Sequence, residues 1–83
     1  MALQTRYATS WFDDGKRVEC PAGTPVRIVD NVAVALAGDD HLQGLVAGRV
    51  KALQAVGESP AVVTLRGRVR VLRKSELVEV GRS

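Results

Sequence analysis

The feature that most constrains this fold is a change of hydrophobic period between Asp39 and Val80. A helical pattern of apolar residues gives way there to strand-like segments that carry alternating arginines. A period of 3.6 residues is typical of a helix with one buried stripe, and a period of 2 is typical of strands with two distinct faces. The order of the two patterns predicts one amphipathic helix packed against an antiparallel sheet.

The helix is expected over about residues 40–56. Asp40, with Gln43 three residues later, has the form of a capping box, and Gly57 stands where a left-handed cap would end the helix. The stripe of apolar residues at helical spacing consists of Leu42, Leu45, Val46, Val50, Leu53 and Val56. Gly44 and Gly48 lie inside the expected helix and cost about 1 kcal/mol each relative to alanine. A strand over Gly44–Leu53 is therefore the alternative.

Arg49 interrupts the apolar stripe of this helix. Its aliphatic stem can lie along the sheet while its charged head reaches the edge. Alternatively, the guanidinium pairs with an acidic group across an interface.

The strands are expected on both sides of the helix. Asp13–Lys16 reads as the turn of an N-terminal hairpin, Pro21–Pro25 as a second turn, and Asp30-Asn31 as a further tight turn. The expected strand segments are Tyr7–Phe12, Arg17–Cys20, Val26–Val29, Val32–Leu36, Ala61–Leu65, Arg68–Leu72 and Leu77–Val80.

The register of the hairpin at residues 61–72 decides what that hairpin presents. A three-residue loop, Leu65 to Gly67, would pair Val63 with Val69 and collect the apolar residues on one face. A two-residue loop would place Val63 beside Arg70 and mix the faces. Since a slip of one residue turns a strand over, burial of one face favours the three-residue loop.

These elements predict a single α+β domain over residues 1–83, with residues 1–10 as an N-terminal arm. The alternative is an all-β barrel. The expected core consists of Val26, Ile28, Val34, Leu36, Leu42, Val46, Val50, Leu53, Val63, Val69, Val71 and Leu77.

Positive charge is concentrated in the C-terminal half. Residues 1–43 hold four basic and six acidic side chains, whereas residues 44–83 hold eight basic and three acidic ones. Arginines alternate along one predicted strand and two more basic residues follow it: Arg66, Arg68, Arg70, Arg73 and Lys74. Such a row suits phosphate groups or an acidic protein surface, and a solvated sheet face is the alternative. The C-terminal half has no aromatic residue for base stacking.

The aromatic residues are confined to the N-terminal segment. Tyr7, Trp11 and Phe12 are expected either to anchor that segment or to form a docking patch. Trp11 and Phe12 are added to the five basic residues as candidate partner-binding residues. They are expected at the end of the molecule away from the arginines.

No residue pattern predicts catalysis, a cofactor or a metal site. His41 is the only histidine and is expected to be solvated, and Cys20, the only cysteine, is expected to be a half-buried strand residue. The acidic pairs Asp13-Asp14 and Asp39-Asp40 occupy turn and cap positions, where aspartate is favoured for backbone reasons. There is no signal-peptide pattern and no apolar run of membrane-spanning length, so a virion or cytoplasmic location is expected.

Two resemblances add to this picture. The segment Ala61–Val80 resembles the closing strands of small SH3-like and Sm-like barrels, which implies a hairpin, a short turn and a final strand. Residues Pro21–Val26 and Val63–Val69 resemble the valine-rich strands of small phage head-decoration (cement) proteins. That second resemblance implies binding to a capsid shell without catalysis.

The sequence therefore predicts a non-catalytic structural protein that binds other protein subunits in a homo- or hetero-oligomer, as a virion accessory component. The alternative function is a small nucleic-acid-binding module that uses the arginines around residues 66–74. An enzyme would need His41 or Cys20 to meet groups from another chain.

Overall fold

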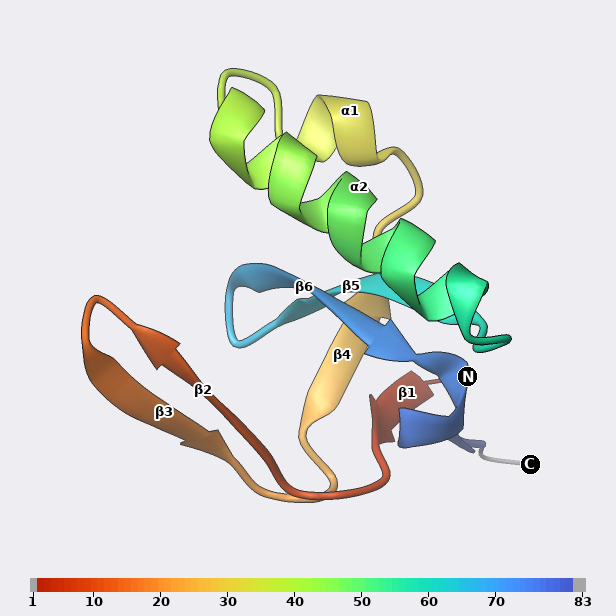
Figure 1. The fold of residues 1–83 in the computed structure, drawn as a ribbon. Coiled ribbons are helices and arrows are strands. Elements are labelled where there is room, and N and C mark those ends of the chain that lie inside the picture. Colours follow the sequence, from red (N-terminus) through yellow and green to blue (C-terminus); the bar gives the residue numbers. More distant parts are fainter. Residues whose placement is uncertain (1, 82–83) are drawn as a thin grey trace.

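The computed structural model describes residues 2–81, which form two antiparallel sheets and one long helix. The elements in chain order are β1 (Ala2–Thr5), β2 (Thr9–Asp13), β3 (Lys16–Cys20), β4 (Pro25–Ile28), α1 (Val32–Ala35), α2 (Asp40–Ala55), β5 (Pro60–Leu65), β6 (Arg68–Arg73), the 3₁₀ turn η1 (Lys74–Glu76) and β7 (Leu77–Val80). Five strands form one sheet in the order β6-β5-β4-β1-β7, and β2 pairs with β3 in a separate ribbon (Figure 1).

The main sheet is curled but open. β6 and β7 lie at opposite edges of the sheet, yet only the three residues of η1 join them. A short link between opposite edges requires the sheet to bend strongly. No ladder connects β6 to β7 among residues 2–81. The alternative of a closed all-β barrel is therefore wrong, and β6 keeps an open edge.

The N-terminal residues are part of the sheet, which corrects the expectation of an arm over residues 1–10. Ala2–Thr5 lies between β4 and β7 as an inner strand. Thr5 is only 3% exposed, and its hydroxyl donates to the carbonyl oxygen of Pro21 at 3.2 Å and accepts from the N–H of Thr24 at 3.1 Å. These bonds connect the start of the chain to the loop before β4. Met1 lies outside the described residues.

The expected strand over Val32–Leu36 is wrong, because this segment begins with the helical turn α1. The Asn31 side chain accepts a hydrogen bond from the Val34 N–H at 3.2 Å, which is the geometry of a helix N-cap. Val34 is 71% exposed and Leu36 is buried, so the segment contributes one core residue instead of a strand face.

The long helix α2 confirms the helical pattern, with one correction at its start. Asp39, rather than Asp40, is the N-cap, and its carboxylate accepts from the Leu42 N–H at 3.0 Å. Gln43 does not close a capping box; its side-chain amide donates to the Leu36 carbonyl at 2.9 Å. The helix ends as expected, with Gly57 at a φ of 80°.

The hairpin β5–β6 has the two-residue loop, so the expected register is wrong. Leu65 pairs with Arg68, and Val63 pairs with Arg70. Arg66 and Gly67 have φ values of 52° and 78°, as a type I′ turn requires. Burial does not prevent this arrangement because both faces of β6 are covered: its residues 69–72 are all half-buried.

The core lies mainly between the sheet and the β2–β3 ribbon. Its buried members are Cys20, Val26, Ala61, Val63, Leu65 and Leu77, with Leu3, Trp11 and Leu72 packed against them. The helix α2 contacts β5 and β6, and its Val46 and Leu53 are buried (Figure 1). Of the expected core, Ile28 and Val34 are exposed instead. Ala61 and Leu65 are buried but were not in the expected core. Cys20 was expected to be half-buried, but it is only 1% exposed.

Candidate docking groove along strand β6

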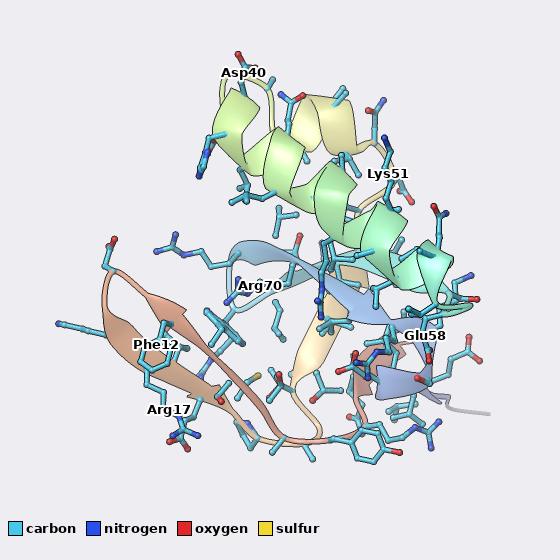
Figure 2. All side chains as sticks on the ribbon, viewed as in Figure 1. Phe12, Arg17, Asp40, Lys51, Glu58 and Arg70 are labelled. Atoms are coloured by element: carbon cyan, nitrogen blue, oxygen red, sulfur yellow. The ribbon has the colours of Figure 1, made fainter. Side chains whose placement is uncertain are left out.

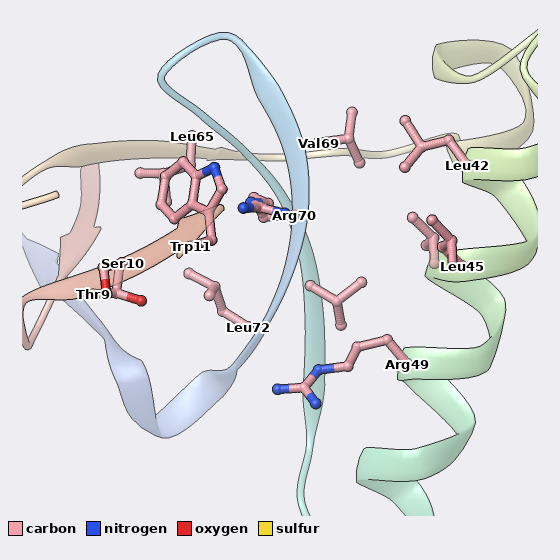
Figure 3. Close-up of a pocket in the computed structure, with 12 residues that line it drawn as sticks. Thr9, Ser10, Trp11, Leu42, Leu45, Arg49, Leu65, Val69, Arg70 and Leu72 are labelled. Atoms are coloured by element: carbon pink, nitrogen blue, oxygen red, sulfur yellow. The ribbon is translucent and has the colours of Figure 1, made fainter. Parts of the chain in front are cut away.

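A groove of about 390 Å³ lies between α2 and the β2–β3 ribbon, with β6 along its floor. Its lining comes from four segments: Thr9, Ser10 and Trp11 of β2; Leu42, Leu45, Val46 and Arg49 of α2; Leu65 of β5; and Val69, Arg70, Val71 and Leu72 of β6. Figure 3 shows Trp11 and Arg70 on one side of β6 and Val69, Leu42 and Leu45 on the other. The groove therefore includes both faces of one strand.

Strand alternation explains why Trp11 lines the groove and Phe12 does not. Trp11 pairs with Val18 across the ribbon, and the next residue, Phe12, pairs with Arg17 and points to the opposite side. Phe12 is accordingly 75% exposed, and it lies with Arg17 on the ribbon (Figure 2). The two aromatics predicted as one contact patch therefore lie on opposite faces.

Arg70 packs against Trp11 as a cation–π pair. The guanidinium carbon of Arg70 lies 4.1 Å from the centre of the Trp11 ring. Such a pair contributes about 0.5–2 kcal/mol, depending on how far it is removed from water. The contact holds a positive charge against the β2 wall, so Trp11 and Arg70 are together in the structure rather than at opposite ends of the molecule.

The backbone of β6 offers hydrogen-bonding groups along the open edge. In a two-residue hairpin the residues that flank the loop, here Leu65 and Arg68, form a hydrogen-bonded pair. Alternation then directs the N–H and C=O groups of Arg70 to β5 and those of Val69 and Val71 away from it. Since β6 is an edge strand, the polar groups of these two valines face the groove.

The groove combines an apolar lining with positive charge. Leu45 is 57% exposed although it belongs to the apolar stripe of α2. Arg49 and Arg70 are the charged members of the lining, and no Asp or Glu is among the described residues that form it. An apolar surface with charges of one sign suits a ligand that carries both apolar and acidic groups.

The basic residues predicted as one contact row lie in three places: the β5–β6 turn, one face of β6 and the far end of that strand. Arg66, in the turn, donates from Nη1 to the Glu19 carbonyl at 2.7 Å, so the turn is attached to the ribbon. Arg68 and Arg70 lie on the face of β6 that Val63 and Leu65 share, not on a face separate from the apolar residues.

Arg73 and Lys74 lie at the far end of β6, roughly 25 Å from the turn along an extended strand. There the Arg73 N–H donates to a Glu76 carboxylate oxygen at 2.9 Å, and the Lys74 N–H donates to the Ser59 carbonyl at 2.8 Å. The predicted row is therefore not one continuous basic surface.

Sequence reasoning missed the α2 wall of the site. Leu45 is expected in the stripe that faces the core, and Arg49, for which an acidic partner across an interface is one of two alternatives, is not in the predicted contact set. The available signal was the arginine itself, because a charge inside an apolar stripe marks a place where burial is incomplete.

Other chemical candidates do not converge on the groove. His41 is exposed near the start of α2, and the Cys20 thiol is buried in the core. Within residues 2–81, no three His, Cys, Asp or Glu side chains gather closely enough to hold a metal ion. None of the helices described there has the length and apolar character needed to cross a membrane.

Comparison with known proteins identified no relative of this chain. No protein-family model, no curated protein and no solved structure matches this chain.

Proposed function

We propose that this chain is a non-catalytic structural protein of the α+β class that binds another protein subunit through the groove along β6. The observation that supports this function best is the composition of the groove: exposed leucine, a tryptophan–arginine pair and an open strand edge lie side by side. Hydrogen-bonding edges beside apolar walls suit protein segments, which supply both kinds of contact.

The proposed setting is a virion, where the chain would be an accessory component of the capsid or head. The resemblance of Pro21–Val26 and Val63–Val69 to head-decoration proteins supports this setting. A domain of this size buries a limited core and gains stability from assembly. We also propose that the segment Ala61–Val80 is related to the closing strands of SH3-like barrels, which it resembles in sequence.

Native size tests the proposed function. The chain, isolated from its natural source under mild conditions, is expected to elute in a complex with other protein subunits in size-exclusion chromatography with light scattering. A stable, partner-free monomer at its natural concentration would refute the proposal.

A matched pair of variants locates the interface. Leu45→Glu introduces a charge into the groove and is expected to release the chain from its complex. Val34→Glu changes a valine that is equally apolar and even more exposed but lies outside the groove, so it is expected to leave the complex intact. Equal effects of the two changes would place the interface elsewhere.

Nucleic-acid binding is the rival function. Arg66, Arg73 and Lys74 have exposed side chains, and the C-terminal half has a positive net charge. A nucleic-acid complex would weaken steeply as salt increases, and charge reversal at Arg66 and Arg73 would weaken it further. Absence of binding to DNA and RNA at low salt removes this alternative.

A further inference from the structure

The open edge of β6 carries charged side chains, Arg68 and Arg70, but no other strand of residues 2–81 pairs with it. Exposed edge strands are commonly covered, interrupted by proline, twisted away or given charged side chains, because their unpaired N–H and C=O groups attract other strands. Here the residues with outward groups are Val69 and Val71, and walls from α2 and β2 stand on both sides of the edge without covering it. The groove thus has the form of a slot for one extended segment.

The register of β6 determines which side chains such a segment would present. Residues of an added antiparallel strand that lie opposite Val69 and Val71 share the face of those valines, beside Leu42 and Leu45 of α2 (Figure 3). The residue between them lies opposite Arg70, on the face of Trp11. The two walls therefore select alternating side chains.

From this geometry we propose that β6 binds an extended segment of a different protein as an additional antiparallel strand. The segment carries an acidic side chain opposite Arg70 and apolar side chains opposite Val69 and Val71. This inference rests on the proposed function and names the chemistry of the partner: an acidic–apolar alternating strand. Backbone hydrogen bonds give the affinity, and the tryptophan–arginine pair with the α2 wall gives the selectivity.

A second copy of this chain does not fit the slot through its own β6. That strand carries Arg68, Arg70 and Arg73 and no acidic residue. Each antiparallel pairing of two β6 strands brings these like charges together across a short strand separation. Charge complementarity thus favours a different, acidic occupant.

The other edge strand of the five-stranded sheet, β7, has the wrong phase. The Arg6 N–H donates to the Glu76 carbonyl at 2.7 Å, so alternation along β1–β7 directs the backbone groups of Glu79 outward. If β7 of another copy paired with β6, Glu79 would therefore lie opposite a valine, and an apolar residue would lie opposite Arg70. Charge complementarity with Arg70 therefore favours an acidic strand of a different chain over either edge of the five-stranded sheet of a second copy.

A peptide titration tests the proposed strand. The probe is a short unlabelled peptide of alternating glutamate and valine, and the readout is the emission of Trp11, the only tryptophan of the protein. Saturable binding with a change in Trp11 emission is expected. A peptide of the same composition with its glutamates in one block, and a peptide of alternating lysine and valine, are each expected to bind at least about tenfold more weakly. Equal binding of the block peptide would overturn the proposal, because charge alone would then be sufficient.

Backbone methylation of the probe separates strand addition from any other mode of binding. In the proposed register the valine N–H groups of the peptide face β6 and the glutamate N–H groups face away. N-methylation of the valines is expected to weaken binding at least about tenfold, while N-methylation of the glutamates leaves it nearly unchanged. Equal effects of the two modifications would overturn the inference.

A protein variant provides the corresponding test in the native complex. Val71→Pro removes an outward N–H without breaking the ladder to β5, and Val71→Thr keeps that N–H with a side chain of similar shape. Provided that circular dichroism shows a folded chain, the proline variant is expected to bind the peptide and the native complex at least about tenfold more weakly than the threonine variant. If both variants stay in the complex, strand addition is wrong and the assembly function stands. A wild-type chain without any complex would instead refute the assembly function.

Discussion

Replacement of Arg66 tests the hairpin register on which the groove depends. In the two-residue loop Arg66 has a φ of 52°, a conformation that costs a residue with a Cβ roughly 1–2 kcal/mol. Asparagine enters this conformation more easily than alanine does. Arg66→Asn and Arg66→Ala both lose the hydrogen bond to Glu19, so their difference isolates the turn.

The expected result is that Arg66→Asn is more stable than Arg66→Ala by about 1 kcal/mol, or roughly 4–8 °C in Tm for a chain of this size. Thermal and urea unfolding, followed by circular dichroism, measure the difference. In the three-residue loop the residue at this position would be right-handed, and alanine would equal or exceed asparagine. That outcome would refute the register.

Nuclear magnetic resonance gives a control that does not depend on stability. In the observed register Thr64 faces Val69, and Val62 faces Val71, as pairs without mutual hydrogen bonds. The Hα atoms of such pairs are close, so strong cross-peaks are expected between them. Cross-peaks between Val63 and Val69 instead would restore the three-residue loop and place Arg70 outside the groove.

Three further changes test the helix and the core by urea unfolding. Asp39→Ala is expected to cost about 1 kcal/mol because it removes the N-cap, whereas Asp40→Ala costs about half of that, since its carboxylate only faces the helix dipole. Gly44→Ala is expected to stabilise the chain by about 1 kcal/mol, because the added methyl group meets open space; a loss of stability would show a close contact there. Leu65→Ala is expected to cost about 2–5 kcal/mol and Val34→Ala less than about 0.5 kcal/mol; similar losses would contradict the observed burial.

The strongest local patterns predicted their elements correctly. The helical stripe with Gly57 after it specified α2, and the turn at Asp14-Gly15 specified the β2–β3 ribbon. Periodicity reports which residues prefer a common face, and a long stripe leaves few alternatives. The segment Val32–Leu36 was different, because five apolar residues fit a helix or a strand equally well. There the Asn31 cap decided for the helix.

Long-range pairing was beyond local patterns. Nothing in Ala2–Thr5 indicates that these residues become an inner strand between β4 and β7, since their partners are distant in the sequence. The site was missed for the same reason. Trp11 and Arg70 are in segments far apart along the chain, and only the placement of the ribbon over the sheet brings them together.

The incorrect register shows how one assumption about burial changed the expected site. A hairpin with one buried face would separate valines from arginines, and the three-residue loop achieves that. In this fold α2 covers one face of β6 and the ribbon covers the other. The side chains on both faces of the strand are therefore partly buried. The conformation of the turn then decides the register. Arg66 and Gly67 form a two-residue turn, and the hydrogen bond from Arg66 to the Glu19 carbonyl stabilises it. That turn is what moves Arg70 from a solvent face to the Trp11 wall and directs the backbone of Val69 and Val71 to the open edge.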